Sequence, residues 1–222
     1  IIRYSSFIRL NIIMELLDFC AAKLIHNGFE AVVLPSAQTA GEYIRETIKD
    51  FAPQSISYGD SMSLFATATI DWLRNQHEIP FIDTFEAGIK YRELIERRRK
   101  ALVCDLFLTG INAISMDGSL HWLDMTGNRI APILFGPRKI ILVAGRNKIV
   151  SNQEDAFKRI REIAAPQNAL RHSDTINTPC IKTGKCSDCA SPQRICNARL
   201  SLLKCYPKCR ICVVLINENW GL

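Results

Sequence analysis

The chain has 222 residues, of which 48% are hydrophobic and 23% are charged. This composition is that of an ordinary globular domain, and it excludes a disordered or collagen-like chain. No apolar run reaches the roughly 18–20 residues that span a bilayer, and the segment that begins at Ile1 lacks the order of a secretion signal. We therefore expect a cytoplasmic protein without a membrane segment.

The charge is unevenly distributed between the two halves of the chain. Residues 1–128 carry 12 Lys and Arg against 16 Asp and Glu, whereas residues 129–222 carry 16 against 6, so the net charges are −4 and +10. A basic half favours an anionic ligand. Because the basic residues are scattered and do not gather on one helix among aromatics, we expect a small anion and no nucleic acid.

Hydrophobic periodicity predicts helices and strands in alternation. The expected elements are a helix at 8–27, a strand at 29–34, a helix at 38–51, a strand at 55–58, a helix at 62–76, a strand at 79–83, a helix at 86–100, strands at 103–108, 111–115, 120–124 and 139–144, a helix at 153–164 and a strand at 210–216. Such alternation predicts an α/β fold with a mainly parallel central sheet that carries an antiparallel hairpin.

Three boundaries follow from local signals. Asp117-Gly118 has hairpin-turn chemistry, and Pro166 is expected to end the helix before it. The basic run at 97–100 is interpreted as a solvated helix C-terminus. Periodicity fades at 168–208, so we expect a single domain in which a cysteine-bearing excursion links an α/β part at 1–167 to a final strand within 209–222.

Four glycine-bearing loops follow predicted strands or the hairpin. In open α/β sheets, ligands bind beyond the carboxyl ends of the strands, where such loops meet. Their small, amide and cationic side chains suit an anion, although each loop alone is equally well explained by a turn or a helix cap. The candidate ligand-binding residues are Gly59, Asp60, Ser61, Thr109, Gly110, Asn112, Gly127, Asn128, Arg129, Gly145, Asn147 and Lys148.

No catalytic residue can be identified from the sequence. The four histidines lie in no recognisable nucleophile or metal motif, and Asp117 is better explained by its turn. Asp60 lies where an anion would bind, and its carboxylate would repel the anion unless a cation or metal intervened. Whether the chain is an enzyme is left open.

Seven of the nine cysteines lie between Cys180 and Cys212. Two-residue spacing lets two thiolates bind one metal ion, so a zinc ion or an iron–sulfur cluster is one interpretation. A redox-active dithiol and reduced structural thiols are the alternatives. Nearby basic side chains are expected to lower the thiol pKa values. The candidate ligands are Cys180, Cys186, Cys189 and Cys196, whereas Cys209 and Cys212 are expected to belong to the last strand.

Several motifs in fixed order resemble one known family. They are Gly59-Asp60-Ser61-Met62-Ser63-Leu64, Thr109-Gly110-Ile111-Asn112-Ala113-Ile114, Asp117-Gly118, Gly127-Asn128-Arg129-Ile130-Ala131, Phe135-Gly136-Pro137, Val143-Ala144-Gly145-Arg146-Asn147-Lys148-Ile149-Val150 and Ala164-Ala165-Pro166-Gln167-Asn168-Ala169. Together they resemble the LUD-domain (lactate-utilisation) proteins, and residues 178–196 resemble the cysteine tail of a branch of small stand-alone bacterial members.

The resemblance implies a fold like that of the sugar-isomerase, CoA-transferase and formyltetrahydrofolate cyclo-ligase group, which is a Rossmann-like three-layer α/β sandwich with a mainly parallel sheet. It also implies a link to the oxidation of L-lactate to pyruvate, in which relatives act beside iron–sulfur and flavin-type partners. Three positions, in two motifs, depart from the family pattern. Asp60 replaces the second glycine of a Gly-Gly-Ser loop, and Cys209 and Cys212 take the Gly and Lys positions of a Gly-Arg-Ile-Lys-like stretch.

These observations leave three hypotheses. The first is a redox subunit or accessory factor of lactate oxidation that uses the cysteines, and its partners would be other lactate-oxidation subunits or a second copy of the chain. The second is an enzyme or binding protein on a CoA-transferase-like scaffold, which would recognise a nucleotide, CoA or a sugar phosphate. The third is a non-catalytic interaction module.

Overall fold

The computed structural model describes residues 2–222, and the side chains of residues 13–222. Its centre is a six-stranded sheet in the order β1 (Glu30–Leu34), β10 (Ile211–Ile216), β7 (Lys139–Gly145), β4 (Leu106–Gly110), β2 (Ile56–Tyr58) and β3 (Phe81–Ile82). All five neighbouring pairs are parallel, and β10 lies between β1 and β7. The predicted α/β class with a mainly parallel sheet is therefore confirmed.

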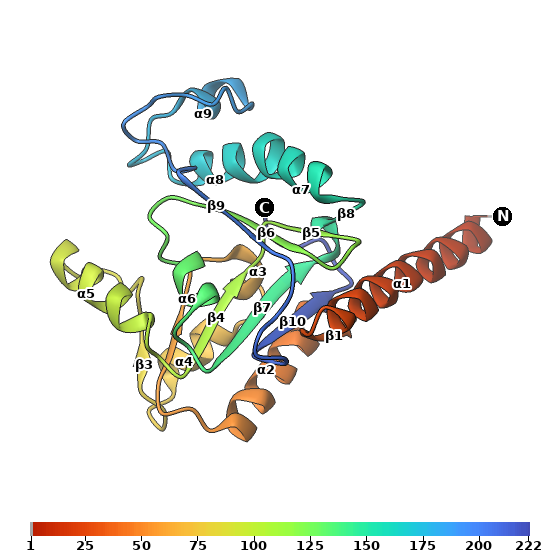
Figure 1. The fold of residues 1–222 in the computed structure, drawn as a ribbon, viewed down its shortest axis with the longest axis horizontal. Helices are drawn as coiled ribbons and strands as arrows, with labels where there is room; N and C mark the ends of the chain where they lie inside the picture. Colours follow the sequence, from red (N-terminus) through yellow and green to blue (C-terminus); the bar gives the residue numbers. More distant parts are fainter. Residues whose placement is uncertain (1) are drawn as a thin grey trace.

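The central strands are buried on both faces. Ile140 and Leu142 of β7 face one hydrophobic cluster, whereas Ile141 and Val143 face the other, as the two-residue period of a strand requires. One face is covered by α2 (Ala37–Phe51), α3 (Met62–Phe65) and α4 (Thr69–Asn75). The opposite face is covered by α1 (Ile2–His26), by α6 (Ile130–Leu134) and by a second sheet (Figure 1).

The second sheet has four strands. Its order is β8 (Ile149–Val150), β5 (Ala113–Ser115), β6 (Leu120–Asp124) and β9 (Ala198–Leu202), and the predicted hairpin forms its middle. The outer face packs against α7 (Gln153–Arg159), and Figure 1 shows α5 (Tyr91–Ala101) at the left edge of the molecule and α9 (Pro179–Thr183) at the top. Among the described residues, no helix is long and apolar enough to cross a bilayer.

The predicted helix at 62–76 is wrong, because the chain forms two helices there. The side chain of Thr67 donates to the carbonyl of Leu64 at 2.7 Å, and Ala68 takes a positive φ of 53° between α3 and α4. A local side-chain bond to the backbone competes with continued helix. Gly41 lets α2 pack closely against the break between α3 and α4, because a Cβ at position 41 would lie only 2.2 Å from the backbone carbonyl oxygen of Thr67.

Pro166 does not end its helix, contrary to the prediction. Helix α7 continues through a π-helical turn, η2 (Ile160–Ala164), into α8 (Ala165–Arg171). The N–H of Ala165 bonds to the carbonyl of Ile160, five residues earlier. A wider turn of this kind accommodates the ring and the missing N–H of the following proline. Strand β9 and helices α6 and α9 were not predicted, and the helix expected at 86–100 begins only at Tyr91.

A buried polar network crosses the second sheet. His121 Nε2 lies 2.9 Å from Ser115 Oγ and 3.0 Å from Ser119 Oγ, and Asp117 accepts hydrogen bonds from both hydroxyl groups. The imidazole is fully buried, and its Nδ1 lies 3.1 Å from Ser201 on β9. Because the carboxylate bonds the serines and not the imidazole, this network is not ordered as a catalytic triad. It joins three strands.

We expect the stability of the protein to fall as the pH drops below about 6.5, the usual His pKa. Burial lowers the pKa of His121, so the folded protein keeps the imidazole neutral where the unfolded chain takes up a proton. The slope contributed by one such group is at most about 1.4 kcal/mol per pH unit. Urea unfolding of His121→Gln between pH 8 and pH 5 should lack this slope, whereas exposed His77→Gln should retain it; equal slopes in both variants would contradict the assignment.

A second prediction concerns Cys209, which precedes β10 with a φ of 63°. This left-handed conformation costs a non-glycine residue roughly 1–2 kcal/mol, and glycine adopts it without that penalty. Cys209→Gly should therefore raise the free energy of unfolding by about 1 kcal/mol in urea titrations. The neighbouring exposed Lys208 has no positive φ, so Lys208→Gly should not stabilise the protein, and stabilisation by both changes would refute the argument.

Candidate functional site

A cavity of about 200 Å³ opens at the carboxyl ends of the parallel strands. Its floor consists of the loops after β2, β4 and β6 together with Lys148, the last residue of the 3₁₀ turn η1 (Arg146–Lys148) after β7. Residues of η2 and α8 form a second wall, and Ile195 and Cys196 close one side. Segments distant in the sequence thus meet around one space, at the edge where open α/β sheets bind ligands.

Seven of the twelve predicted ligand-binding residues line this cavity. They are Asp60, Ser61, Gly110, Asn112, Asn128, Arg129 and Lys148. Gly59 and Thr109 are not in the lining, but Thr109 Oγ1 donates to the Gly59 carbonyl, and a Cβ at Gly59 would lie 2.6 Å from Arg129 Cγ. These two residues support the wall.

The other three predicted residues, Gly127, Gly145 and Asn147, lie outside the lining. Asn147 binds the last segment of the chain, since its Oδ1 accepts from Trp220 N at 3.1 Å and its Nδ2 donates to the Gly221 carbonyl. A Cβ at Gly145 would lie 2.4 Å from that same Trp220 nitrogen. The Gly145 loop therefore holds the chain end in place and contributes only Lys148 to the cavity.

The carboxylate of Asp60 is neutralised by a neighbouring cation. Both terminal nitrogens of Arg171, at the end of α8, contact its two oxygens, and His172 Nε2 lies 3.6 Å away. Arg171 is held in turn by the side chain of Asn168 at 3.0 Å. The repulsion of an anion expected from Asp60 is thus offset by a bidentate ion pair.

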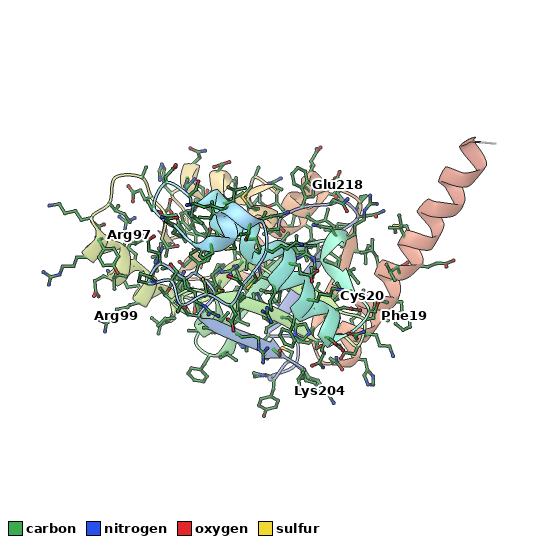
Figure 2. The ribbon with its side chains drawn as sticks, turned by 90° about the horizontal axis from the view of Figure 1, so that it is seen from above. Phe19, Cys20, Arg97, Arg99, Lys204 and Glu218 are labelled. Carbon is green, nitrogen blue, oxygen red and sulfur yellow. The ribbon has the colours of Figure 1, made fainter. Side chains whose placement is uncertain are left out.

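Arg98 lines the cavity, and the sequence analysis missed it. Figure 2 places Arg97 and Arg99 on α5 at the margin of the molecule. Arg99 is exposed, as predicted for a solvated helix end, whereas Arg97 is half-buried and forms ion pairs with Glu86 and Glu93. Arg98, in contrast, faces inward with a buried Nε that has no hydrogen-bond partner among the described residues, and its guanidinium lies 5.2 Å from the Phe85 ring centre. Burial lowers its pKa. Its three-residue spacing from buried Ala101 was the available signal.

Lys148 is the most buried cation of the cavity. Its side chain is 4% exposed, and Nζ donates to the Ile111 carbonyl at 2.8 Å. Burial lowers the pKa of this amine to about 7, and the charges of Arg159 and Arg129 act in the same direction. Removal from water and neighbouring cations both disfavour the ammonium form.

The lining carries more cations than the carboxylates can pair. Asp60 pairs with Arg171, and Asp124 pairs with Arg129 at 3.3 Å. Within the part of the chain that the structure describes, neither Arg98 nor Lys148 forms an ion pair with a carboxylate. The electrostatics of the cavity therefore favour an anion.

The four candidate metal ligands line a second, much smaller pocket beside the cavity. Cys180, Cys186, Cys189 and Cys196 surround a volume of about 10 Å³, which is close to the space of one water. Cys196 also lines the main cavity, together with Ala165 and Ile195, so the two spaces share a wall. The four thiols are thus neighbours in the fold.

The thiols supply suitable donors but not a ready-made arrangement. Among the described residues, no group of three or more His, Cys, Asp or Glu side chains is arranged to hold a metal ion. The expected lowering of thiol pKa values is wrong for Cys196, because burial raises its pKa in spite of Arg194. Cys212 lies in β10, as expected, whereas the exposed Cys209 precedes that strand.

Comparisons with known proteins identify the family. The crystal structure of a DUF162 family protein from Deinococcus radiodurans, at 1.70 Å resolution, covers 92% of this chain and 97% of its own, with a TM-score of 0.50 and 13% identity. At that identity the similarity concerns the fold alone. The curated proteins give no significant match. The model of the LUD domain matches residues 20–216. The chain therefore belongs to the LUD-domain family, as its motifs predicted.

Proposed function

We propose that this protein binds a small organic anion in the main cavity and serves as an accessory or redox subunit in the oxidation of L-lactate to pyruvate. Membership of the LUD-domain family associates the chain with lactate utilisation. The observation that carries the proposal is the pair of cavity cations, Arg98 and Lys148, that have no carboxylate partner among the described residues. Binding of an anion would satisfy the permanent charge of Arg98 and the fraction of Lys148 that is protonated near its pKa of about 7.

The size of the cavity favours a small ligand over a large one. Pockets for drug-sized molecules have volumes of about 300–1,000 Å³, so a cavity of about 200 Å³ is too small to enclose a nucleotide or CoA. Ile111, Leu123 and Ile160 add apolar lining beside the cations. A short carboxylate with a methyl group, such as lactate or pyruvate, matches this combination, whereas CoA could place only one end inside.

The side chains suggest how such an anion would be held. A guanidinium binds a carboxylate through two parallel hydrogen bonds, and the buried Nε of Arg98 is a donor without a partner in the described part of the chain. Asn112 is oriented by the Leu123 N–H, which donates to its Oδ1 at 3.1 Å, so its amide NH₂ remains a donor for the ligand. We infer that Arg98 binds the carboxylate and Asn112 a second oxygen.

Thermal-shift titrations with lactate, pyruvate and inorganic phosphate test this proposal, since a ligand specific to the folded state raises the melting temperature. Arg98→Met should weaken the affinity by at least about tenfold, because a hydrogen bond to a charged group contributes about 1.5–3 kcal/mol. Without ligand, the variant should melt at the same temperature or higher, because it removes a buried unpaired Nε. Exposed Arg99→Met, one residue along the same helix, is the control. No shift of the wild type by any of the three anions would overturn the proposal.

We propose in addition that the cysteine pocket binds a metal ion or cluster. Support comes from the four thiols around one pocket, a donor set that suits zinc or an iron–sulfur cluster. Since no three of them are arranged for a metal, the sulfur atoms would have to move toward one another. Such a group would supply a redox or structural centre separated from the anion only by the shared wall. Reduced structural thiols are the competing interpretation.

Metal analysis after anaerobic purification, followed by titration of the apoprotein with Co²⁺, tests this second proposal. Thiolate ligation should give about one metal site per chain and an intense charge-transfer absorption that Zn²⁺ abolishes. The double variant Cys186→Ser and Cys189→Ser should lose both signals. Cys209→Ser, which changes an exposed thiol outside the pocket, should keep them. Metal-free protein without a cobalt signal would leave the thiols structural.

A further inference from the structure

We propose that the amine of Lys148 forms an imine with the carbonyl group of a small anion that bears a ketone or aldehyde. The inference rests on the proposed anion site, because Arg98 must hold the acidic group of the same ligand. It adds a covalent step to that site and narrows the ligand class to oxo acids and phosphorylated aldehydes or ketones. The evidence lies in the surroundings of one side chain.

Lys148 is buried inside the fold, yet it faces the cavity. It is 4% exposed and lines the cavity. Its Nζ donates a hydrogen bond to the Ile111 carbonyl oxygen at 2.8 Å, which holds the amine in place. Gly221 packs over the amine, since a Cβ there would lie 2.7 Å from Nζ. A surface lysine samples many positions, whereas this one is held next to the space that a ligand would occupy.

Two arginines near Lys148 are held in place by hydrogen bonds to backbone carbonyls. Arg159 donates to the carbonyls of Asn112 at 2.6 Å and Asn147 at 3.0 Å, and Arg129 donates to the Leu123 carbonyl at 2.8 Å. These fixed charges act with burial to lower the pKa of Lys148 to about 7. A neutral amine carries the lone pair that nucleophilic attack requires, and lysines made neutral by burial and a nearby cation are the ones that form Schiff bases.

The step balances without an oxidant or a metal. The nitrogen lone pair attacks the carbonyl carbon and forms a carbinolamine. The carbonyl oxygen leaves as water, taking both amine hydrogens, and one proton from solvent gives the iminium form of the new C=N bond. A cation is then formed inside a basic cavity, so the carboxylate or phosphate of the ligand itself supplies the compensating negative charge.

Reductive trapping tests the inference on the full-length protein. Wild type is incubated at pH 7 with sodium cyanoborohydride and either pyruvate or glyceraldehyde 3-phosphate, and the modified lysines are located by peptide mass spectrometry. Labelling of Lys148 should exceed that of exposed Lys158 by at least about tenfold, because a pKa near 7 leaves far more neutral amine than the usual value of about 10.4. The reagent that labels identifies carboxylate or phosphate as the acidic group.

Variants and a competitor separate this inference from the anion site. Lys148→Arg keeps the charge but cannot form an imine, so it should show no adduct at position 148, whereas Lys158→Arg should be labelled as the wild type is. Lactate, which has the carboxylate but no carbonyl, should reduce labelling of wild-type Lys148, and this measurement requires no variant to fold. Equal labelling of Lys148 and exposed lysines, or none, would overturn the imine while an anion-dependent melting shift still supported the proposed function. Absence of both would remove both proposals.

Discussion

The ion pair between Asp60 and Arg171 is the contact on which the site depends. It joins the loop after β2 to the end of α8, two elements that are 111 residues apart. The pair neutralises a carboxylate at the edge of the sheet and fixes one wall of the cavity at the same time. Without it, Asp60 would cancel one of the two unpartnered cations, and α8 would have no charged contact with the loop below it.

Arg171 reaches Asp60 only because its helix continues past a proline. If the helix ended at Pro166, the chain would turn away before Asn168 and Arg171, two and five residues later, could face the cavity. The bond from Ala165 N–H to the Ile160 carbonyl widens the turn and lets the helix proceed. The residues of this π-turn and its flank, Ile160, Ala164 and Ala165, also line the cavity. The backbone irregularity thus shapes the wall and positions the cation behind it.

The fold class and most of the strands were predictable from the sequence because the central sheet is buried on both faces. Strands such as β7 and β10 are continuous apolar runs. In the helices, apolar residues recur every three to four positions. Short elements were less visible. Strand β9, Ala-Arg-Leu-Ser-Leu, alternates apolar and polar residues, but it is only five residues long, and it gains its order from pairing with β6. The break between α3 and α4 depends on a threonine hydroxyl, which periodicity does not register.

For the site, the sequence indicated which loops would converge but not which charges would remain unpaired. Asn112 and Lys148 were predicted because they follow β4 and β7, and parallel strands bring their carboxyl ends to one edge. Arg129 was predicted from the glycine-bearing loop after the hairpin. Arg98 was missed because it lies in a run of four basic residues at a helix end, a pattern typical of a solvated surface. The partner of Asp60 was equally hidden, since nothing local links it to Arg171. The net charge of the cavity depends on ion pairs between residues that are distant in the sequence, and local sequence patterns do not reveal such pairs.

The position of the cysteine pocket follows from β9, the strand that the sequence analysis did not predict. Register pairs Ala198 at the start of β9 with Asp124 at the end of β6, and Asn197 N–H donates to the Asp124 carbonyl at 3.0 Å. Cys196 is therefore carried to the rim where Asp124 and Arg129 meet, and this residue lines both spaces. A cysteine segment attached through a flexible linker would have no such constraint. Because β9 is part of the sheet, Cys196 keeps a fixed position beside the anion cavity, which is the geometry that communication between a bound anion and the cysteine pocket would require.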